Sequence, residues 1–489
     1  MTLPGHSVTI GEVEPSGARG GGAATAFMVG ITEKGPSDRP VVARSLAEWV
    51  ETFGSRQSYS QAAYDAADIF FREGGSLLYT ARVIGPAPVK ATANILDQSG
   101  STVPGDVALV VTAKSAGEWA NALNHTITVD GTNFRITITH DTDGTLETSP
   151  LLATRDDAVA WAANVSEYVD IALGASNEDP RAQGPTSLAG GTDDRANIAD
   201  AHWAAALALL TPDYGPGQVM APGRTTSAGY TQLLGHAAAH NRRALLDGAD
   251  TATVSTLTSA SLALRGAAGH TDRFGKLLAP WVIYPGLAAG TTRTVAPSAF
   301  QAGRIAAAEA AGRNPNEAAA GALGVSAQAV GISQAAWTDA DRETLNEAGV
   351  SVFRLFKGSV TIYGDRTLVN PLTDSNWKSF ANSRLIMAIA AACDDVMDAF
   401  DFAQIDGRGN VFAKLGGELR GRALLPFYQA EALYGETPED AFLVDVGPDV
   451  NTPSTIANGE IKAKVAVTVS PNGERLNVEI VKRALEGVA

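Results

Sequence analysis

Ala23-Ala-Thr-Ala-Phe-Met-Val-Gly-Ile31 is a short, mostly apolar run with the pattern of a buried β-strand. Ser45-Leu-Ala-Glu48 places a serine and a glutamate three residues apart, which is the pattern of a helix capping box. Residues 61–73 form an amphipathic helix pattern that ends at two glycines, and Leu77-Leu-Tyr-Thr-Ala-Arg-Val-Ile84 has the pattern of the next strand. A strand, two helices and a second strand in succession predict the opening of an α/β layer.

The same alternation of helices and strands returns after residue 190. Helices are predicted at 197–209 and 227–241, and an alanine-rich helix with an exposed loop is predicted at 300–345. The strands predicted in this stretch are Arg243–Asp247, Trp281–Tyr284, Ser351–Phe356 and Val360–Tyr363. Residues 23–86 and 191–372 are therefore assigned to one α/β core.

The chain between these two stretches has a different character, because it is rich in Thr, Val, Asp and Gly. Short strands separated by turn signals are predicted at Val107–Thr112, Thr126–Val129 and Phe134–Thr139, followed by a helix at Arg155–Val165. Residues 87–190 are predicted to form a small β-rich domain inserted into the core.

Strand-like runs also lie near both ends of the sequence. Ile461-Lys-Ala-Lys-Val-Ala-Val-Thr-Val469 and Leu476-Asn-Val-Glu-Ile-Val481 alternate at a period of two, and Ser7-Val-Thr-Ile10 is a third short run. A glycine-rich tract with the composition of a flexible tether follows Ser7–Ile10, so residues 1–22 are predicted to be an arm. Such strands predict arms that complete β-sheets in neighbouring copies of the chain. Residues 373–489 form the last predicted domain, helical to Tyr434 and β-stranded beyond it.

Composition narrows the possible functions. The 489 residues carry a net charge of −16, which argues against a general nucleic-acid binder. The single cysteine, Cys393, excludes a disulfide framework and is predicted to be a small buried core residue. The start of the sequence has no signal-peptide pattern, and the apolar run at 385–393 is too short to span a membrane. The sequence therefore predicts a globular protein folded in a cytoplasm, without membrane insertion.

Several segments in order resemble a known family. They are Thr25–Pro36, Phe70–Val83, Ala113–Leu123, Leu188–Asp193, Met220–Arg224, Ala279–Trp281, Ala348–Arg354 and Thr437–Phe442, together with the terminal strands. Together they resemble the tail sheath proteins of contractile bacteriophages and related injection machines, including R-type bacteriocins. The resemblance covers nearly the whole chain and departs mainly at 285–345 and in the inserted domain.

This resemblance implies an α/β (α+β) multidomain fold with a subtilisin-like core, an inserted β-rich domain, a C-terminal α+β domain and extended terminal β-arms. It implies a virion tail protein, assembled in the host bacterial cytoplasm, that polymerises around a tail tube and contracts. The implied partners are the chain itself, in rings that are usually hexameric, the tube protein, and the baseplate and tail terminator proteins. A sheath of a non-phage injection system is the alternative.

By the same resemblance, two arms pair with adjacent subunits. Val8 and Ile10 lie in the N-terminal arm, and Leu476, Val478 and Ile480 lie in the C-terminal arm. The expected host strand contains Val465 and Val467. A rival hypothesis stays open, because Pro471-Asn-Gly473 is also a hairpin signal that would fold 476–481 back onto 461–469 within one chain.

The contact with the tube is placed by the resemblance near a helix at 411–425. Lys414, Arg420 and Arg422 make this segment locally basic in an acidic protein. Glu418 lies four residues from both Lys414 and Arg422, so ordinary pairing within the helix explains those two cations. Arg420 is the cation that such pairing does not explain.

Residues that could carry chemistry have simpler interpretations. Ser298 lacks the sequence context of a subtilisin-like nucleophile, base and acid, and is predicted to be a helix N-cap. His236 and His240 have the spacing of a metal pair but no third ligand, and are predicted to be exposed. Asp394, Asp395, Asp398 and Asp401 lack the spacing of a calcium loop and are predicted to form a solvated helix face. The sequence therefore predicts no catalysis, no cofactor and no metal, with a subtilisin-like hydrolase as the weaker alternative.

Overall fold

The computed structural model describes residues 24–99, 106–326, 328–334 and 336–473. Contacts divide these residues into two compact units. Unit 1 contains the described residues up to Gly312 together with Ala319–Phe380. Unit 2 contains Arg313–Ala318 together with the described residues from Ala381 onward.

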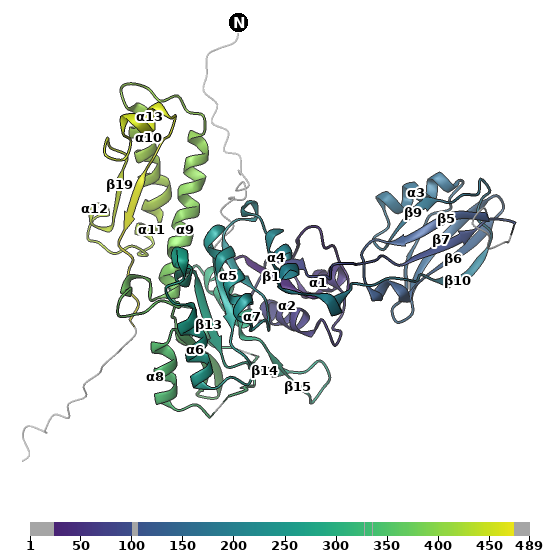
Figure 1. The fold of residues 1–489 in the computed structure, drawn as a ribbon, viewed down its shortest axis with the longest axis horizontal. Helices are drawn as coiled ribbons and strands as arrows, with labels where there is room; N and C mark the ends of the chain where they lie inside the picture. Colours follow the sequence, from purple (N-terminus) through teal and green to yellow (C-terminus); the bar gives the residue numbers. More distant parts are fainter. Residues whose placement is uncertain (1–23, 100–105, 327, 335, 474–489) are drawn as a thin grey trace, which may run out of the picture. The chain divides into compact units, whose positions relative to one another are not determined.

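Unit 1 is built on an eight-stranded sheet with the strand order β18-β17-β13-β12-β11-β1-β3-β2 (Figure 1). The six inner strands run parallel, and β18 and β2 pair antiparallel at the two edges. The strands are β1 (Ala26–Gly30), β2 (Val41–Ala43), β3 (Leu78–Arg82), β11 (Gly217–Met220), β12 (Arg242–Asp247), β13 (Gly275–Ala279), β17 (Val350–Phe356) and β18 (Ser359–Tyr363). A parallel sheet of this kind needs helices over both faces.

Two apolar layers meet those faces. Met28 of β1 joins a cluster with α1 (Leu46–Phe53), α2 (Gln61–Arg72) and α7 (Pro297–Ala310). Its neighbours Phe27 and Val29 point the other way, into a cluster with helices of the second layer. That layer contains α4 (Asp200–Ala208), α5 (Ser227–Ala239), α6 (Val254–Leu264) and α8 (Asp339–Glu347). The strictly alternating side chains of one buried strand thus serve both layers.

A small sheet with the order β15-β14-β16 belongs to the same unit. Its strands are β14 (Val282–Pro285), β15 (Thr292–Val295) and β16 (Gly331–Ile332). Arg293 of β15 is buried and forms ion pairs with Asp65 and Asp68 of α2. These ion pairs tie the β14–β15 hairpin to the helix.

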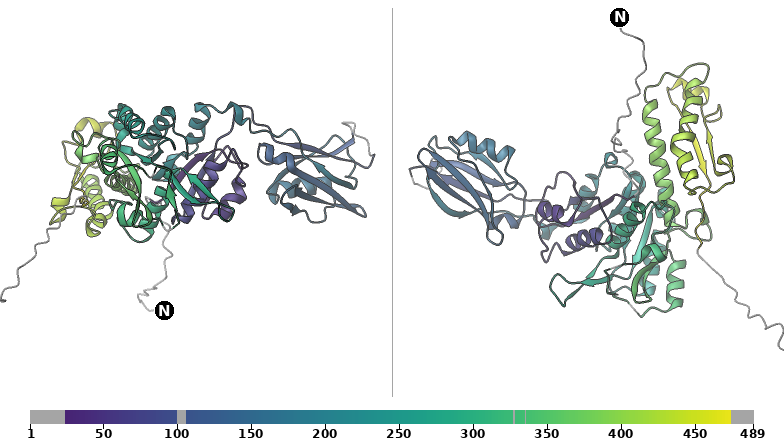
Figure 2. Two further views of the ribbon diagram at one scale, coloured as in Figure 1. Left: turned by 90° about the horizontal axis from the view of Figure 1, so that it is seen from below. Right: turned by 180° about the vertical axis from the view of Figure 1, so that it is seen from behind.

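The chain between β3 and α4 forms a β-rich body with its own core (Figure 2). One sheet has the order β10-β6-β7-β8 and another has the order β4-β5-β9. The elements are β4 (Thr92–Leu96), β5 (Val107–Ala113), β6 (Leu123–Asp130), β7 (Asn133–His140), β8 (Gly144–Thr148), α3 (Arg155–Asn164), β9 (Val169–Leu173) and β10 (Gln183–Ser187).

Unit 2 packs helices against a two-stranded sheet. Its long helix, α9 (Phe380–Met397), begins at the last residue of unit 1. It is followed by α10 (Asn410–Glu418), a π-helical turn at Leu419–Leu424, α11 (Leu425–Gln429), α12 (Pro438–Ala441), β19 (Phe442–Asp445), α13 (Pro453–Ala457) and β20 (Lys464–Val467). Among the described residues, none of the helices is long and apolar enough to cross a lipid bilayer.

Most predicted elements appear with small shifts, and the mixed α/β class is confirmed. The short strand β2 was not predicted. The prediction of a nine-residue strand at 461–469 is wrong, because β20 contains only four of these residues. Cys393 is only partly buried, so its prediction as a buried core residue is also wrong. The division of the chain into four segments stays a prediction.

Candidate subunit-contact surfaces

The sheet of unit 2 is the strongest candidate for a contact between copies of the chain. β19 and β20 pair antiparallel, with Phe442 opposite Val467 and Val444 opposite Val465. In the part of the chain that the structure describes, this sheet has only these two strands. A sheet edge without a partner strand presents backbone groups that another chain can pair with.

The hydrogen-bond pattern shows which residues face the open edge of β20. The Thr468 amide, one residue beyond β20, donates to the Ala441 carbonyl at 2.8 Å, so Thr468 faces β19. Because alternate residues of an antiparallel strand bond to the same neighbour, Ala466 and Lys464 also face β19. The N–H and C=O groups of Val465 and Val467 therefore point away from β19, toward the open edge.

The side chains of the same two valines hold β20 against unit 2. Val465 and Val467 are partly buried and pack on the cluster formed by the helices of this unit. The intervening Lys464 and Ala466 are exposed. The predicted alternation of the 461–469 run is thus confirmed, although the strand is shorter than predicted.

The outer edge of β19 is partly occupied. Arg420 donates from its guanidinium to the Val444 carbonyl at 3.2 Å, on the side of β19 away from β20. Arg420, the cation that pairing within the helix left over, thus bonds to a backbone carbonyl, and its part in a tube contact stays a prediction. Arg422 pairs with Glu418 at 3.4 Å, as its spacing predicts. The Lys414 ammonium instead lies over the Phe400 ring, 5.9 Å from its centroid.

Asn316 is a buried residue of unit 2 that the sequence did not single out. Its side-chain amide donates to the carbonyls of Ala432 and Ser470, both at 3.3 Å. The backbone carbonyl of Asn316 accepts a hydrogen bond from the Asn472 side chain at 2.7 Å. Asn316 therefore fixes the chain just beyond β20. The prediction of an exposed loop in this region missed it, because its partners lie more than 100 residues away.

Five further residues were predicted to lie in the arms. Val8, Ile10, Leu476, Val478 and Ile480 lie outside the described residues. Their pairing, between chains or within one chain, stays a prediction.

The candidate nucleophile Ser298 is a structural residue in this fold. It is fully buried at the second position of α7, whose N-cap is Ala296, so the prediction that Ser298 is the N-cap is wrong. Its hydroxyl donates to the Asp247 carboxylate at 2.9 Å, and its amide donates to the same carboxylate at 2.7 Å. Burial raises the pKa of Asp247 to about 6.

His236 of α5 is buried and His240, the C-cap residue of that helix, is partly buried, so the prediction that both are exposed is wrong. His236 is buried, and Arg242 donates to its Nε2 at 2.9 Å. Burial, together with the charges of Arg242 and His240, lowers the pKa of His236 to about 3. A guanidinium at this distance disfavours a metal ion at the same nitrogen. Among the described residues, no group of three or more His, Cys, Asp and Glu side chains is arranged to hold a metal ion.

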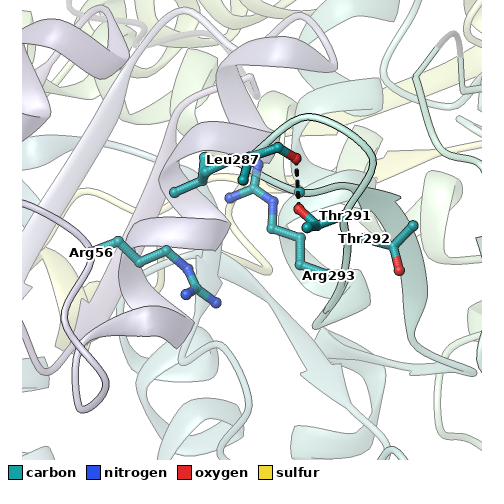
Figure 3. Close-up of a pocket in the computed structure, with 7 residues that line it drawn as sticks. Arg56, Leu287, Thr291, Thr292 and Arg293 are labelled. Carbon is teal, nitrogen blue, oxygen red and sulfur yellow. Dashed lines mark hydrogen bonds between the residues drawn. The ribbon is translucent and has the colours of Figure 1, made fainter.

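A shallow hollow of about 250 Å³ lies beside the β14–β15 hairpin (Figure 3). Arg56 and Arg293 line it, but both guanidiniums are held by Asp65 of α2. Asp68 pairs with Arg293 and also with Arg72. The result is a chain of alternating charges that fixes the hairpin to α2 rather than a set of groups free to react.

Comparisons with known proteins match the fold but not the sequence. No protein-family model matches the sequence, and it has no significant match among curated proteins. The structure resembles a sheath tail protein of Desulfitobacterium hafniense with a TM-score of 0.58 and 15% identity, over 90% of this chain and 93% of that chain. It resembles a sheath tail protein of Listeria innocua with a TM-score of 0.63 and 14% identity, over 87% of this chain and 89% of that chain.

A third resemblance is to the helical sheath of the anti-feeding prophage in its contracted state. The TM-score is 0.54 and the identity 16%, over 99% of this chain and 100% of that chain. Identities this low establish a shared fold and nothing finer. The resemblance predicted from the sequence is confirmed at this level: the chain has the fold of the tail sheath proteins.

Proposed function

We propose that this chain is a sheath subunit, which polymerises as stacked rings around a tail tube and contracts to drive the tube through a target cell envelope. The observation that carries this proposal is the share of each chain that the structural match covers. The fold extends over 99% of this chain and 100% of the contracted anti-feeding prophage sheath subunit, so no large part of that subunit lacks a counterpart. A non-phage injection system, such as the extracellular one whose contracted sheath the chain also resembles, is the alternative.

The open edge of β20 gives the proposal a physical basis. An extended arm from a neighbour would bond to the outward amides and carbonyls of Val465 and Val467. Each such hydrogen bond contributes about 1 kcal/mol net. Backbone pairing on a tether can persist while the bodies of the subunits move, whereas packed surfaces separate when they slide.

The two arm hypotheses compete for this edge and can be separated by a disulfide. Val467→Cys combined with Val478→Cys, in a Cys393→Ser background, places one thiol in β20 and one in the C-terminal segment. Pairing between subunits would give covalent multimers on a non-reducing gel. Pairing within a chain would give a cross-linked monomer.

The remaining partners belong to the same proposal. We place the tube contact on the face of α10 and the π-helical turn that carries Lys414 and Arg422, whose side chains are exposed. Arg420 is exposed as well, and its bond to the Val444 carbonyl occupies one of its five N–H groups, so we include it in the same contact. The ends of the polymer would bind baseplate and terminator proteins in a particle assembled in a bacterial cytoplasm.

The core invites comparison with subtilisin-like folds, and we propose that it shares their arrangement without their chemistry. The support is a parallel sheet covered on both faces, with a serine in the first turn of α7. That serine is buried against Asp247, so its hydroxyl is not presented to a substrate.

Removal of residues 1–20 tests the proposal. The full-length chain, expressed alone, should form hollow cylinders in negative-stain electron micrographs. The shortened chain should give the same circular dichroism spectrum but no cylinders. A shortened chain that polymerises normally would refute the arm mechanism. A full-length chain that forms no cylinders even with a tube protein would refute the sheath function.

A further inference from the structure

The β17–β18 hairpin of unit 1 presents an unusual surface, which we call the basic hairpin face. It consists of Arg354, Phe356, Lys357 and Tyr363. Val352 pairs with Tyr363 and Arg354 with Thr361, so Arg354, Phe356 and Tyr363 lie on the same face of the two strands. The Arg354 guanidinium lies 3.3 Å from the centroid of the Tyr363 ring and 4.5 Å from that of Phe356.

The rings of this face are exposed to solvent, and its positive charges are not neutralised by carboxylates of the described residues. Phe356 is 45% and Tyr363 51% exposed, and the Lys357 ammonium lies 5.3 Å from the Phe356 centroid. Within the described ranges, neither Arg354 nor Lys357 forms an ion pair with a carboxylate, and Nε of Arg354 is buried without a hydrogen-bond partner. Exposed aromatic side chains beside unpaired cations are typical of a binding surface.

A second surface, in unit 2, has the complementary chemistry. We call it the acidic turn: Asp394 and Asp395 in α9, followed by Asp398, Asp401 and Phe402. All four carboxylates are exposed, and none forms an ion pair among the described residues. Phe402 is 108% exposed, the largest value for a bulky apolar side chain in this part of the chain. Its φ of 59° is uncommon for a bulky residue.

We infer that the basic hairpin face of one subunit binds the acidic turn of a second copy. The charges of the two surfaces are opposite, and Phe402 would add an aromatic ring to those of Phe356 and Tyr363. The inference rests on the proposed self-assembly and adds a side-chain contact to the backbone pairing of the arms. Because the two surfaces differ, the contact is head-to-tail, and each copy keeps one free face of each kind. Repeated, it generates a ring or a helix.

Charge reversal tests this contact in the full-length chain. Lys357→Glu places like charges together and should raise the protein concentration needed for polymer to sediment about tenfold or more. Asp401→Lys should do the same, and the double variant should restore assembly. Arg39→Glu, an equal charge change at an exposed residue, is the matched control. Phe402→Ser should also weaken assembly without loss of stability, because the ring is fully exposed.

Mixing the two single variants identifies where the contact lies. Chains that carry Lys357→Glu and chains that carry Asp401→Lys would complement each other in a mixture only if the contact joins different copies. Assembly of the mixture supports the inference. Rescue by the double variant without rescue by mixing would mean a contact within one chain and would overturn it. Normal assembly of Lys357→Glu would overturn it too, while wild-type cylinders would leave the sheath function intact.

Discussion

Asp247 stands out among single residues because its carboxylate is buried and pairs with no cation among the described residues. It accepts hydrogen bonds from the amides of Gly223 and Ser298 and from the Ser298 hydroxyl. Burial outweighs these bonds and raises the pKa of Asp247 to about 6, above the unfolded value near 3.8. The folded state thus holds this proton more tightly, so the contribution of Asp247 to stability is greatest below pH 3.8 and is lost as pH rises through 6.

Asp247→Asn removes this titration. Between pH 4 and pH 7, the free energy of unfolding of the variant should gain about 2 kcal/mol relative to the wild type. Urea denaturation at the two pH values measures the change, with Asp38→Asn, an exposed carboxylate, as the control. An equal difference between variant and wild type at both pH values would contradict the assignment.

The buried hydrogen bonds of Asn316 lead to a prediction about the stability of unit 2. Asn316→Ala should destabilise unit 2 by about 1–3 kcal/mol, because the buried carbonyls of Ala432 and Ser470 lose a donor. Hydrogen exchange at residues 468–472 should become faster. Asn314→Ala removes a bond from a more exposed asparagine and should cost less than about 1 kcal/mol.

Single residues were also where prediction from the sequence was weakest. Local spacing correctly paired Arg422 with Glu418, because both lie on one helix. The partners of Arg420 and Asn316 are backbone carbonyls brought near by folding, and no local pattern contains them. The prediction for His236 failed for the same reason, since Arg242 bonds to it from a different element.

At the scale of elements, the orientation of β20 can be tested with proline. Val465→Pro removes an amide that faces the open edge, so the β19–β20 ladder should survive and the protein should stay folded. Strand addition should fail, and cylinders should be absent from negative-stain micrographs. Ala466→Pro removes an amide that faces β19 and should instead destabilise unit 2 by about 1–3 kcal/mol. Cylinders formed by Val465→Pro would exclude this edge as the host.

Elements were predicted well where their cause is local. The apolar run at Ala26–Gly30 and the capping serine of α1 specify their own structures. The strand at 461–469 was predicted too long because Asn451 holds Lys462, donating to its carbonyl and accepting from its amide at 2.8 Å. These bonds replace the ladder at the start of the run, and they depend on a side chain eleven residues away.

For the whole molecule, the alternation of helices and strands predicted the α/β class, but not where the chain divides into units. Arg313–Ala318 lies in unit 2 although the chain on both sides of it belongs to unit 1. The chain therefore passes between the units at residues 312–313, 318–319 and 380–381. The hydrogen bonds of Asn314 and Asn316 to residues more than 100 positions later explain this division, and the local sequence pattern does not contain them.

Two compact units predict two unfolding transitions. Scanning calorimetry of the chain lacking residues 1–20, which we expect to remain unassembled, should show two overlapping transitions. Asn316→Ala should lower the midpoint of one by about 5 °C per kcal/mol, and Asp247→Asn should shift only the other. Because these residues lie in different units, the two effects should add in the double variant. A single transition that both substitutions shift together would show that the two units unfold as one.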